Sequence, residues 1–157
     1  MDAIRTEKLT KRYKSLTAVD ALDLTVKEGE LFALLGVNGA GKSTTVKMLS
    51  CLVRPTEGDA FLCGHSVRKE AAAVKSIIGV SPQETAVAPN LTVRENLLLM
   101  CGIYGFSKEK RAAQMALLTE KLGLDTVLKR AAGKLSGGWQ RRLSIAMALI
   151  GEPRVLF

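Results

Sequence analysis

A glycine-rich loop between two apolar segments constrains this 157-residue sequence more than any other feature. Residues 36–43 read Gly-Val-Asn-Gly-Ala-Gly-Lys-Ser and fit the pattern G-x-x-x-x-G-K-[ST]. The run Leu31–Leu35 before the loop is unbroken and apolar, which predicts a strand buried on both faces. After the loop, Val46, Leu49 and Leu52 share one face of a predicted helix. A chance glycine turn is the alternative, and both flanking segments argue against it.

The chemistry of this loop predicts a nucleoside triphosphate site. Glycines lack a Cβ atom, so the chain can curl tightly and point successive N–H groups into one concavity. The start of the following helix adds unpaired N–H donors and the positive end of its dipole. Lys42 is placed to reach the β- and γ-phosphates, and the Ser43 hydroxyl is placed to ligate Mg²⁺. The residues expected to bind the nucleotide are Gly36, Asn38, Gly39, Gly41, Lys42, Ser43 and Thr44.

The length and composition predict one globular domain that stays in the cytoplasm. Hydrophobic residues make up 47% of the chain. No apolar run approaches the roughly 18 residues of a membrane span, and the N-terminus lacks a signal-peptide core. Cys51, Cys63 and Cys101 lie far apart and His65 is the only histidine. We therefore expect reduced thiols and no metal site built from His and Cys.

The net charge of +8 could suggest a nucleic-acid partner. The positive residues are spread along the chain, however, and aromatic residues make up 4% of it and do not interleave with them. Solvated helix faces explain most of this charge, so no nucleic acid is expected.

Period-2 patterns and turn residues predict antiparallel strands mixed with a parallel core. Ile4–Lys14 is a predicted strand that ends near Tyr13, and Leu22–Val26 alternates like a strand with one wet face. Ala60–Cys63 is a short predicted strand. Ile77–Val80 is a predicted core strand that cannot continue past Pro82.

Capping signals predict two successive helices. Thr92 and Glu95 form a capping box that opens a helix through about Tyr104. Ser107 caps the next helix, and Gly123 ends it. No strand separates the two helices, so we expect them to form a helical lobe.

The segment Leu135–Gln140 places Ser136, Gly137 and Gly138 directly before another amphipathic helix. A hydroxyl and bare N–H groups at a helix N-terminus predict a second anion site by the same physics. An ordinary N-cap with flexible glycines is the alternative that this motif alone leaves open. After the helix, Val155–Phe157 starts a new apolar strand. A domain rarely ends in this way, so we interpret the sequence as a fragment.

The phosphate loop, Gln83 after a core strand and the Leu135–Gln140 signature, in this order, resemble the ATP-binding cassette (ABC) family over the whole chain. Within that family the sequence is similar to the ATPase subunits of bacterial exporters. The resemblance implies an α/β P-loop NTPase fold with a mixed N-terminal β subdomain and an inserted helical subdomain, incomplete at its C-terminus. It implies a single nucleotide-binding domain at 1–157, made of a β and P-loop core at 1–82, a helical lobe at 83–134, and the signature helix with the start of a strand at 135–157.

The resemblance also implies residue roles. Tyr13 matches the aromatic residue that stacks on adenine, with a strand-edge tyrosine as the alternative. Gln83 matches the glutamine that contacts Mg²⁺ and the attacking water, with a loop glutamine as the alternative. Ser136, Gly137 and Gly138 match the signature that completes the ATP site of the opposing subunit. The implied catalytic residues are Lys42, Gln83 and Ser136, and the implied metal ligands are Ser43 and Gln83.

By this resemblance the protein uses ATP and Mg²⁺ and hydrolyses ATP. It couples ATP-driven dimerisation, with a second copy or a paired nucleotide-binding domain, to export through a separate or fused membrane permease. It is then a cytoplasmic protein that is peripheral on the inner face of the cell membrane. The alternative is a soluble ABC-type ATPase that acts on ribosomes or nucleic acid. The sequence between Lys42 and Ser136 lacks the heptads of the chromosome-maintenance members.

The sequence also departs from the family pattern. The magnesium-binding aspartate and catalytic glutamate should follow a strand such as Val155–Phe157, and neither is present. His65 precedes Gln83, so we expect a surface turn residue there rather than the family's switch histidine. Glu84 and Glu152 are likewise not candidates for the general base. We therefore expect the fragment to bind ATP weakly and hydrolyse it poorly, although the full gene product would be an ATPase.

Overall fold

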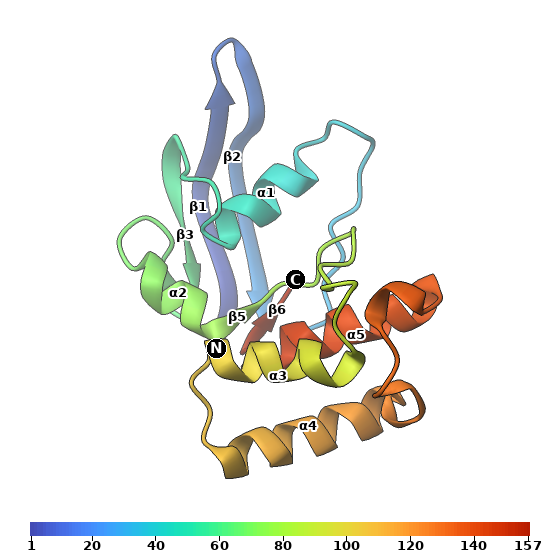
Figure 1. Cartoon of the computed structure of the whole chain (residues 1–157). Helices are drawn as coiled ribbons and strands as arrows, with labels where there is room; N and C mark the ends of the chain where they lie inside the picture. Colours follow the sequence, from blue (N-terminus) through green and yellow to red (C-terminus); the bar gives the residue numbers. More distant parts are fainter. The chain divides into compact units, whose positions relative to one another are not determined.

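The computed structural model describes residues 1–157, which divide into two compact units, Met1–Ile78 and Gly79–Phe157 (Figure 1). The first unit is built on a four-stranded sheet with the order β2-β1-β3-β4. Its elements are β1 (Asp2–Tyr13), β2 (Leu16–Lys27), α1 (Lys42–Leu49), β3 (Glu57–Leu62), β4 (His65–Ser66) and α2 (Ala71–Ile77). The second unit contains β5 (Ile78–Gly79, which begins at the boundary), α3 (Val93–Ile103), α4 (Lys108–Leu122), the 3-10 turns η1 (Asp125–Val127) and η2 (Ala132–Lys134), α5 (Gly137–Leu149) and β6 (Val155–Leu156).

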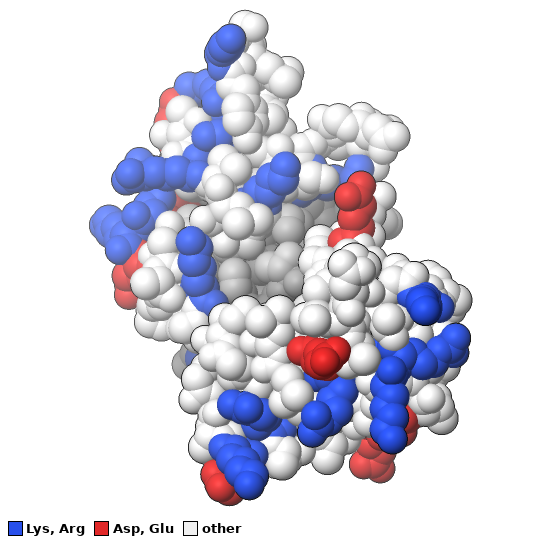
Figure 2. All heavy atoms as spheres, viewed as in Figure 1, with Lys and Arg blue, Asp and Glu red and all other residues white.

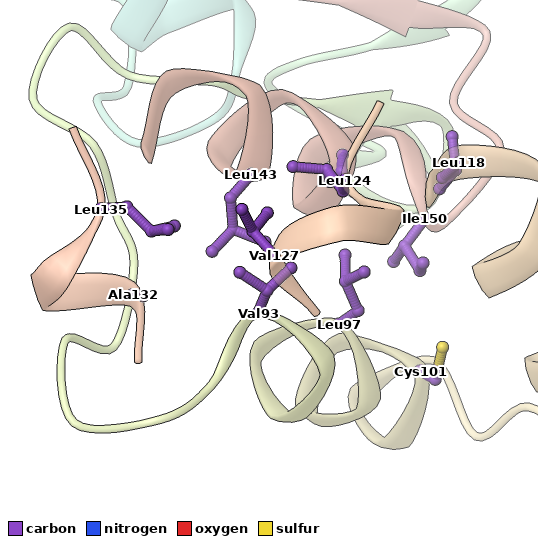
Figure 3. Packing of buried hydrophobic residues seen from close by; sticks show 11 residues of the cluster. Val93, Leu97, Cys101, Leu118, Leu124, Val127, Ala132, Leu135, Leu143 and Ile150 are labelled. Atoms are coloured by element: carbon purple, nitrogen blue, oxygen red, sulfur yellow. The ribbon is translucent and has the colours of Figure 1, made fainter. Parts of the chain in front are cut away.

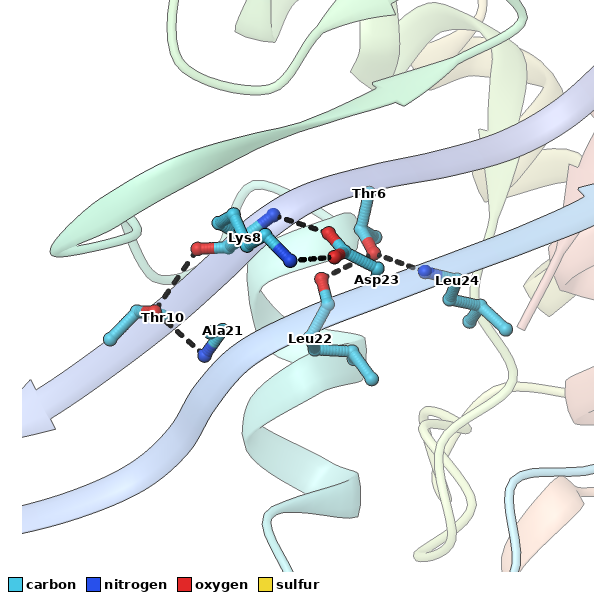
Figure 4. Close-up of polar contacts among 7 residues, drawn as sticks. All are labelled: Thr6, Lys8, Thr10, Ala21, Leu22, Asp23 and Leu24. Atoms are coloured by element: carbon cyan, nitrogen blue, oxygen red, sulfur yellow. Dashed lines mark hydrogen bonds and ion pairs between the residues drawn. The ribbon is translucent and has the colours of Figure 1, made fainter.

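The long hairpin of β1 and β2 contains register shifts. Near these shifts, two buried threonines of β1 form side-chain hydrogen bonds with the main chain of β2 (Figure 4). The Thr6 hydroxyl donates to the Leu22 carbonyl over 2.7 Å and accepts from the Leu24 amide over 2.8 Å. The Thr10 hydroxyl accepts from the Ala21 amide over 2.9 Å. The register shifts between Thr6 and Leu9 and again after Leu9. Because a bulge leaves ladder groups without partners, these hydroxyls hold the two strands together where the backbone does not.

The predicted buried strand Leu31–Leu35 is wrong. These residues belong to neither sheet, and Leu31 is 100% exposed and Leu35 is 87% exposed. A strand forms only where a neighbouring chain takes up its N–H and C=O groups. No strand pairs with this segment. The apolar pattern alone is therefore not sufficient to form a strand.

The other predicted strands are present, with some changed bounds. β1 and β2 confirm the strands expected up to Tyr13 and around Leu22–Val26, and β2 is longer than expected. β5 and β6 confirm the two short apolar strands, and the Phe157 amide donates to the Gly79 carbonyl over 2.9 Å. His65 was expected in a surface turn, but it lies in the short strand β4, half-buried, with Nδ1 3.0 Å from the Glu70 carboxylate.

The helices of the second unit follow their capping signals. Thr92 and Glu95 form a complete capping box at the start of α3. The hydrogen bond from the Thr92 amide is the largest cause that lowers the pKa of the Glu95 carboxyl. At α4 the Ser107 side chain accepts from the Lys110 amide over 3.2 Å, and Gly123 ends the helix in the left-handed conformation.

One hydrophobic cluster holds these helices together (Figure 3). Val93 and Leu97 of α3 point toward Val127 and Leu143, so the helix faces meet along their apolar stripes. The buried members of the cluster are Val93, Leu97, Cys101, Leu118, Leu124, Val127, Ala132, Leu135, Leu143, Ala146 and Ile150.

Asn96 is a fully buried polar residue within α3, and it fixes the loop that leads into this helix. Its Oδ1 accepts from the Ala88 amide over 2.8 Å, and its Nδ2 donates to the Ala88 carbonyl over 3.1 Å. The same Nδ2 lies 3.3 Å from the Leu91 carbonyl and 3.0 Å from the Thr92 carbonyl. One buried amide group therefore contacts backbone groups on both sides of residue 90.

The Lys and Arg side chains are distributed over both units in the view of Figure 2, with Asp and Glu between them. Some of them are paired on the surface, as in the contacts of Lys27 with Asp2 and of Lys110 with Glu152. None of the helices combines the length and the apolarity that crossing a bilayer requires.

Replacing Thr6 by valine keeps the shape of the side chain but removes the hydroxyl that bridges β1 and β2. We expect a loss of about 1–3 kcal/mol in the free energy of unfolding, because the Leu24 amide and the Leu22 carbonyl lose their partner in a buried place. Urea denaturation measures this. Thr25→Val, at an exposed position of β2, is the matched control and should change stability by less than about 0.5 kcal/mol. Equal effects of the two substitutions would contradict the role given to Thr6.

Replacing Asn96 by alanine should release the loop before α3. The Ala88 amide would lose its acceptor, and we expect its hydrogen exchange to accelerate by at least about tenfold, since an unmade buried hydrogen bond costs about 1–3 kcal/mol. Exchange measured by NMR or mass spectrometry tests this. Asn90→Ala, an exposed substitution in the same loop, should leave the rate unchanged.

Candidate functional site

The glycine-rich loop is open chain that ends at the first turn of α1. Gly41 is the N-cap of this helix in the left-handed conformation, with φ 84°, and no side chain caps the helix. A single turn bond, from the Ala40 amide to the Val37 carbonyl over 3.2 Å, closes the loop. The helix proper begins to pair at Thr45, whose amide donates to the Gly41 carbonyl over 2.8 Å.

Between these two bonds the main chain carries donors without acceptors. The amides at the start of α1 make no hydrogen bond, because a helix has no carbonyls to offer to its first N–H groups. The loop glycines before them add two more donors of the same kind. The amides without an acceptor are those of Gly39, Gly41, Lys42, Ser43 and Thr44. Free N–H groups at a helix N-terminus are able to bind an anion.

The Lys42 ammonium lies over this loop. Its Nζ donates to the Gly36 carbonyl over 2.6 Å and to the Val37 carbonyl over 2.8 Å. Two of its three donors are thereby used, and the third remains available to a ligand. The Ser43 side chain is exposed beside it, and no hydrogen bond occupies its hydroxyl. The loop thus combines a positive charge, a hydroxyl and bare amides within one helical turn.

Gly41 is required by its packing as well as by its conformation. A Cβ atom at this position would lie 2.2 Å from the Ala18 carbonyl oxygen and 3.1 Å from a methyl of Val19. The start of α1 therefore rests directly on the backbone of β2, with Thr45 and Met48 buried behind it. This contact fixes where the loop amides point.

Tyr13 lies in the same unit, at the end of β1. Its register partner across the hairpin is Leu16 of β2, two residues before the Ala18 carbonyl that Gly41 approaches. The Tyr13 side chain is 42% exposed. The hairpin thus presents an aromatic ring on the strand pair that supports the phosphate loop.

Gln83 lies in the second unit, in the segment between β5 and α3. It is exposed and makes no hydrogen bond of its own, but its neighbours are fastened to α5. The Pro82 carbonyl accepts from the Arg141 guanidinium, and the Thr85 hydroxyl lies 3.4 Å from the Gln140 side-chain oxygen. The Gln83 segment is therefore attached on both sides to the first turns of the signature helix.

Ser136 is the N-cap of α5, and its hydroxyl makes no capping hydrogen bond. The caps of α3 and α4, Thr92 and Ser107, both use their hydroxyls for capping. A Cβ at Gly137 or Gly138 would meet nothing within 4 Å, so the two residues after Ser136 face open space. The helix begins with an available hydroxyl and available amides, as an anion site requires.

Sequence reasoning missed the residues that hold this end of α5. The Gln140 Nε2 donates to the Ala132 carbonyl over 3.2 Å and to the Leu135 carbonyl over 3.3 Å. The Arg142 guanidinium lies over the Trp139 ring, 4.9 Å from its centroid, and Trp139 itself packs against the hydrophobic cluster. The Trp139–Arg142 contact joins residues three apart on one helix, whereas the Gln140 contacts depend on the turn that brings the Ala132 and Leu135 carbonyls close to the helix.

Glu84 and Glu152, which the sequence analysis excluded as general bases, both lie at the surface or in surface ion pairs. Glu84 is exposed. Glu152 contacts Gln114 and accepts from the Lys110 ammonium over 2.7 Å, so its carboxylate joins α4 to the turn after α5. No group of three or more His, Cys, Asp or Glu side chains lies close enough together to hold a metal ion.

Known proteins share both the sequence pattern and this fold. The chain is 45% identical over 161 residues to the human ATP-binding cassette sub-family A member 2, covering 99% of this chain and 7% of that protein. It is 43% identical to the Nod factor export ATP-binding protein I of Burkholderia orbicola, covering 93% of this chain and 48% of the relative. The chain thus spans less than half the length of these curated relatives.

A solved structure agrees. A bacterial ABC transporter cassette in dimeric form superposes with a TM-score of 0.83 at 29% identity, over 98% of this chain and 72% of that chain. The family model described as ABC transporter matches residues 19–157, which include the phosphate loop, Gln83 and the signature. The chain therefore belongs to the ABC transporter family, and its α/β P-loop fold is that of the family's ATP-binding cassette.

Proposed function

We propose that this chain is the ATP-binding and ATP-hydrolysing part of a transporter and that it couples ATP-driven dimerisation to export through a membrane permease. The observation that carries the proposal is the row of main-chain donors without acceptors beside the Lys42 ammonium. A triphosphate supplies the negative oxygens that these donors lack, and hydrogen bonds to charged groups contribute about 1.5–3 kcal/mol each. Four or five of them account for micromolar binding, which corresponds to about 8 kcal/mol, after ordering costs.

In this proposal each part of the nucleotide has its own residues. Tyr13 stacks on the base, and Lys42 contacts the β- and γ-phosphates. The loop residues around Lys42 cradle the phosphates with their amides; they are Gly36, Asn38, Gly39, Gly41, Ser43 and Thr44.

Mg²⁺ that arrives with the nucleotide is proposed to take oxygens from Ser43 and Gln83, the two residues that match the family's metal ligands. Both offer neutral oxygens, and no cluster of acidic side chains provides a separate metal cage. Mg²⁺ usually combines a few protein oxygens with phosphate oxygens and water, so this sparse donor set is suitable. A metal ion there would neutralise charge on the transferring phosphoryl group.

Ser136, Gly137 and Gly138 are proposed to bind the nucleotide held by a second cassette. Their exposure and the uncommitted hydroxyl support this role, and the solved cassette that the chain resembles is dimeric. The Gln83 segment, which is attached to the first turns of α5, would pass the state of that contact to the permease through the helical lobe at 83–134. The protein would then be peripheral on the cytoplasmic face of the membrane. The relative named for Nod factor export supports the export direction.

Replacing Lys42 by alanine should weaken ATP binding at least about tenfold, because the loop loses its charge-assisted contacts to the phosphates. Isothermal titration calorimetry on the intact protein measures this. Lys47→Ala removes the same charge from an exposed position of α1 and serves as the control. Unchanged ATP affinity in the Lys42→Ala variant would refute the proposal.

Replacing Ser136 by alanine should leave ATP binding to the phosphate loop intact and lower ATP turnover by about 10- to 100-fold, the range expected for one hydrogen bond to a charged group. Turnover is measured on the intact protein with its permease. Ser107→Ala is the matched control, because it removes a hydroxyl that only caps α4 and should affect stability rather than turnover. If both variants lost turnover equally, the special role of Ser136 would be wrong.

A further inference from the structure

The Lys11 ammonium lies over one face of the Tyr13 ring. The two residues are on the same side of β1, because side chains alternate along a strand. The Lys11 Nζ lies over the ring, 5.0 Å from its centroid, and donates to the Arg54 carbonyl over 2.8 Å. The ammonium therefore has two simultaneous partners, the aromatic face and a main-chain oxygen.

The Arg54 carbonyl is itself held in place by the chain that follows it. The Thr56 amide donates to the Thr10 carbonyl over 2.9 Å, and the Arg12 amide donates to the Thr56 hydroxyl over 3.1 Å. The Arg12 guanidinium also pairs with Glu57. These contacts attach the end of β1 to the turn at 54–57, so the carbonyl that accepts from Lys11 belongs to a segment that is hydrogen-bonded to β1.

A cation over an aromatic face is attracted by the negative charge of the ring's π cloud. It also covers that face, so a flat ligand can stack only on the other one. We infer that Lys11 is a positioning residue for the base of the nucleotide: it orients the Tyr13 ring and leaves one face open to the adenine. This inference rests on the proposed function, and it concerns base binding rather than phosphate binding.

A second explanation for Lys11 would be general attraction of a positive charge for the phosphates. The two explanations differ in one measurable respect. A positioning role acts through Tyr13 and affects only ligands that carry a base. General attraction acts equally on a ligand without a base.

The test compares ATP with inorganic tripolyphosphate, each titrated calorimetrically into the intact protein. Lys11→Met should weaken ATP binding by about 2–5-fold, the factor that an exposed cation–π contact supplies, and leave tripolyphosphate binding unchanged. Lys11→Arg should restore ATP affinity, because a guanidinium also stacks on aromatic faces. Lys14→Met is the matched control: it removes the same charge beside Tyr13, where no ring contact exists, and should change neither ligand. Retained tripolyphosphate binding also reports that each variant is folded.

A double-mutant cycle separates action through the ring from independent action. In the Tyr13→Ala background, the further change Lys11→Met should no longer weaken ATP binding. Full additivity, an equal loss of tripolyphosphate affinity, or unchanged ATP affinity in Lys11→Met would each overturn the inference while leaving the proposed function standing. If the unmodified protein bound neither ligand, the proposed function would fail and the inference with it.

Discussion

The close approach of Gly41 to the Ala18 carbonyl is the contact on which the phosphate loop depends. It seats the start of α1 on the backbone of β2 without a side chain between them. With the start of the helix seated there, its first amides make no hydrogen bond within the chain. The buried threonines of the β1–β2 hairpin contribute to the same support, since their hydroxyls join β1 to β2, the strand on which the helix rests. A site made of main-chain donors is only as well defined as the sheet beneath it.

Local signals in the sequence predicted the parts of this structure that local chemistry decides. The capping box at Thr92, the serine cap at Ser107 and the glycine stop at Gly123 each involve groups within four residues of one another. Their geometry is therefore nearly independent of the rest of the fold. The same is true of the amides without acceptors in the first turn of α1, because the first N–H groups of any helix lack a partner within it.

Features that depend on distant partners could not be predicted in this way. The run Leu31–Leu35 has the composition of a buried strand, but it belongs to neither sheet. A strand also needs neighbouring strands to pair with, and the composition of a segment does not identify them. The hydrogen bonds of Asn96 could not be predicted from the sequence, because the carbonyls that accept them lie in an irregular loop. The attachment of the Gln83 segment to α5 through Arg141 and Gln140 joins residues more than 50 positions apart. The roles of Gln83 and of the signature residues therefore came from resemblance, and the structure adds the contacts that link their segments.

The uncommitted hydroxyl of Ser136 has a consequence for the energetics of its own helix. A serine cap normally stabilises a helix by about 1 kcal/mol through its bond to the first turn, and α5 forgoes this contribution. Its first turn should consequently fray more readily than those of α3 and α4. The chain thus keeps a locally weak helix end at the place where an outside anion could serve as the missing cap, so that ligand binding and the ordering of the turn become a single event.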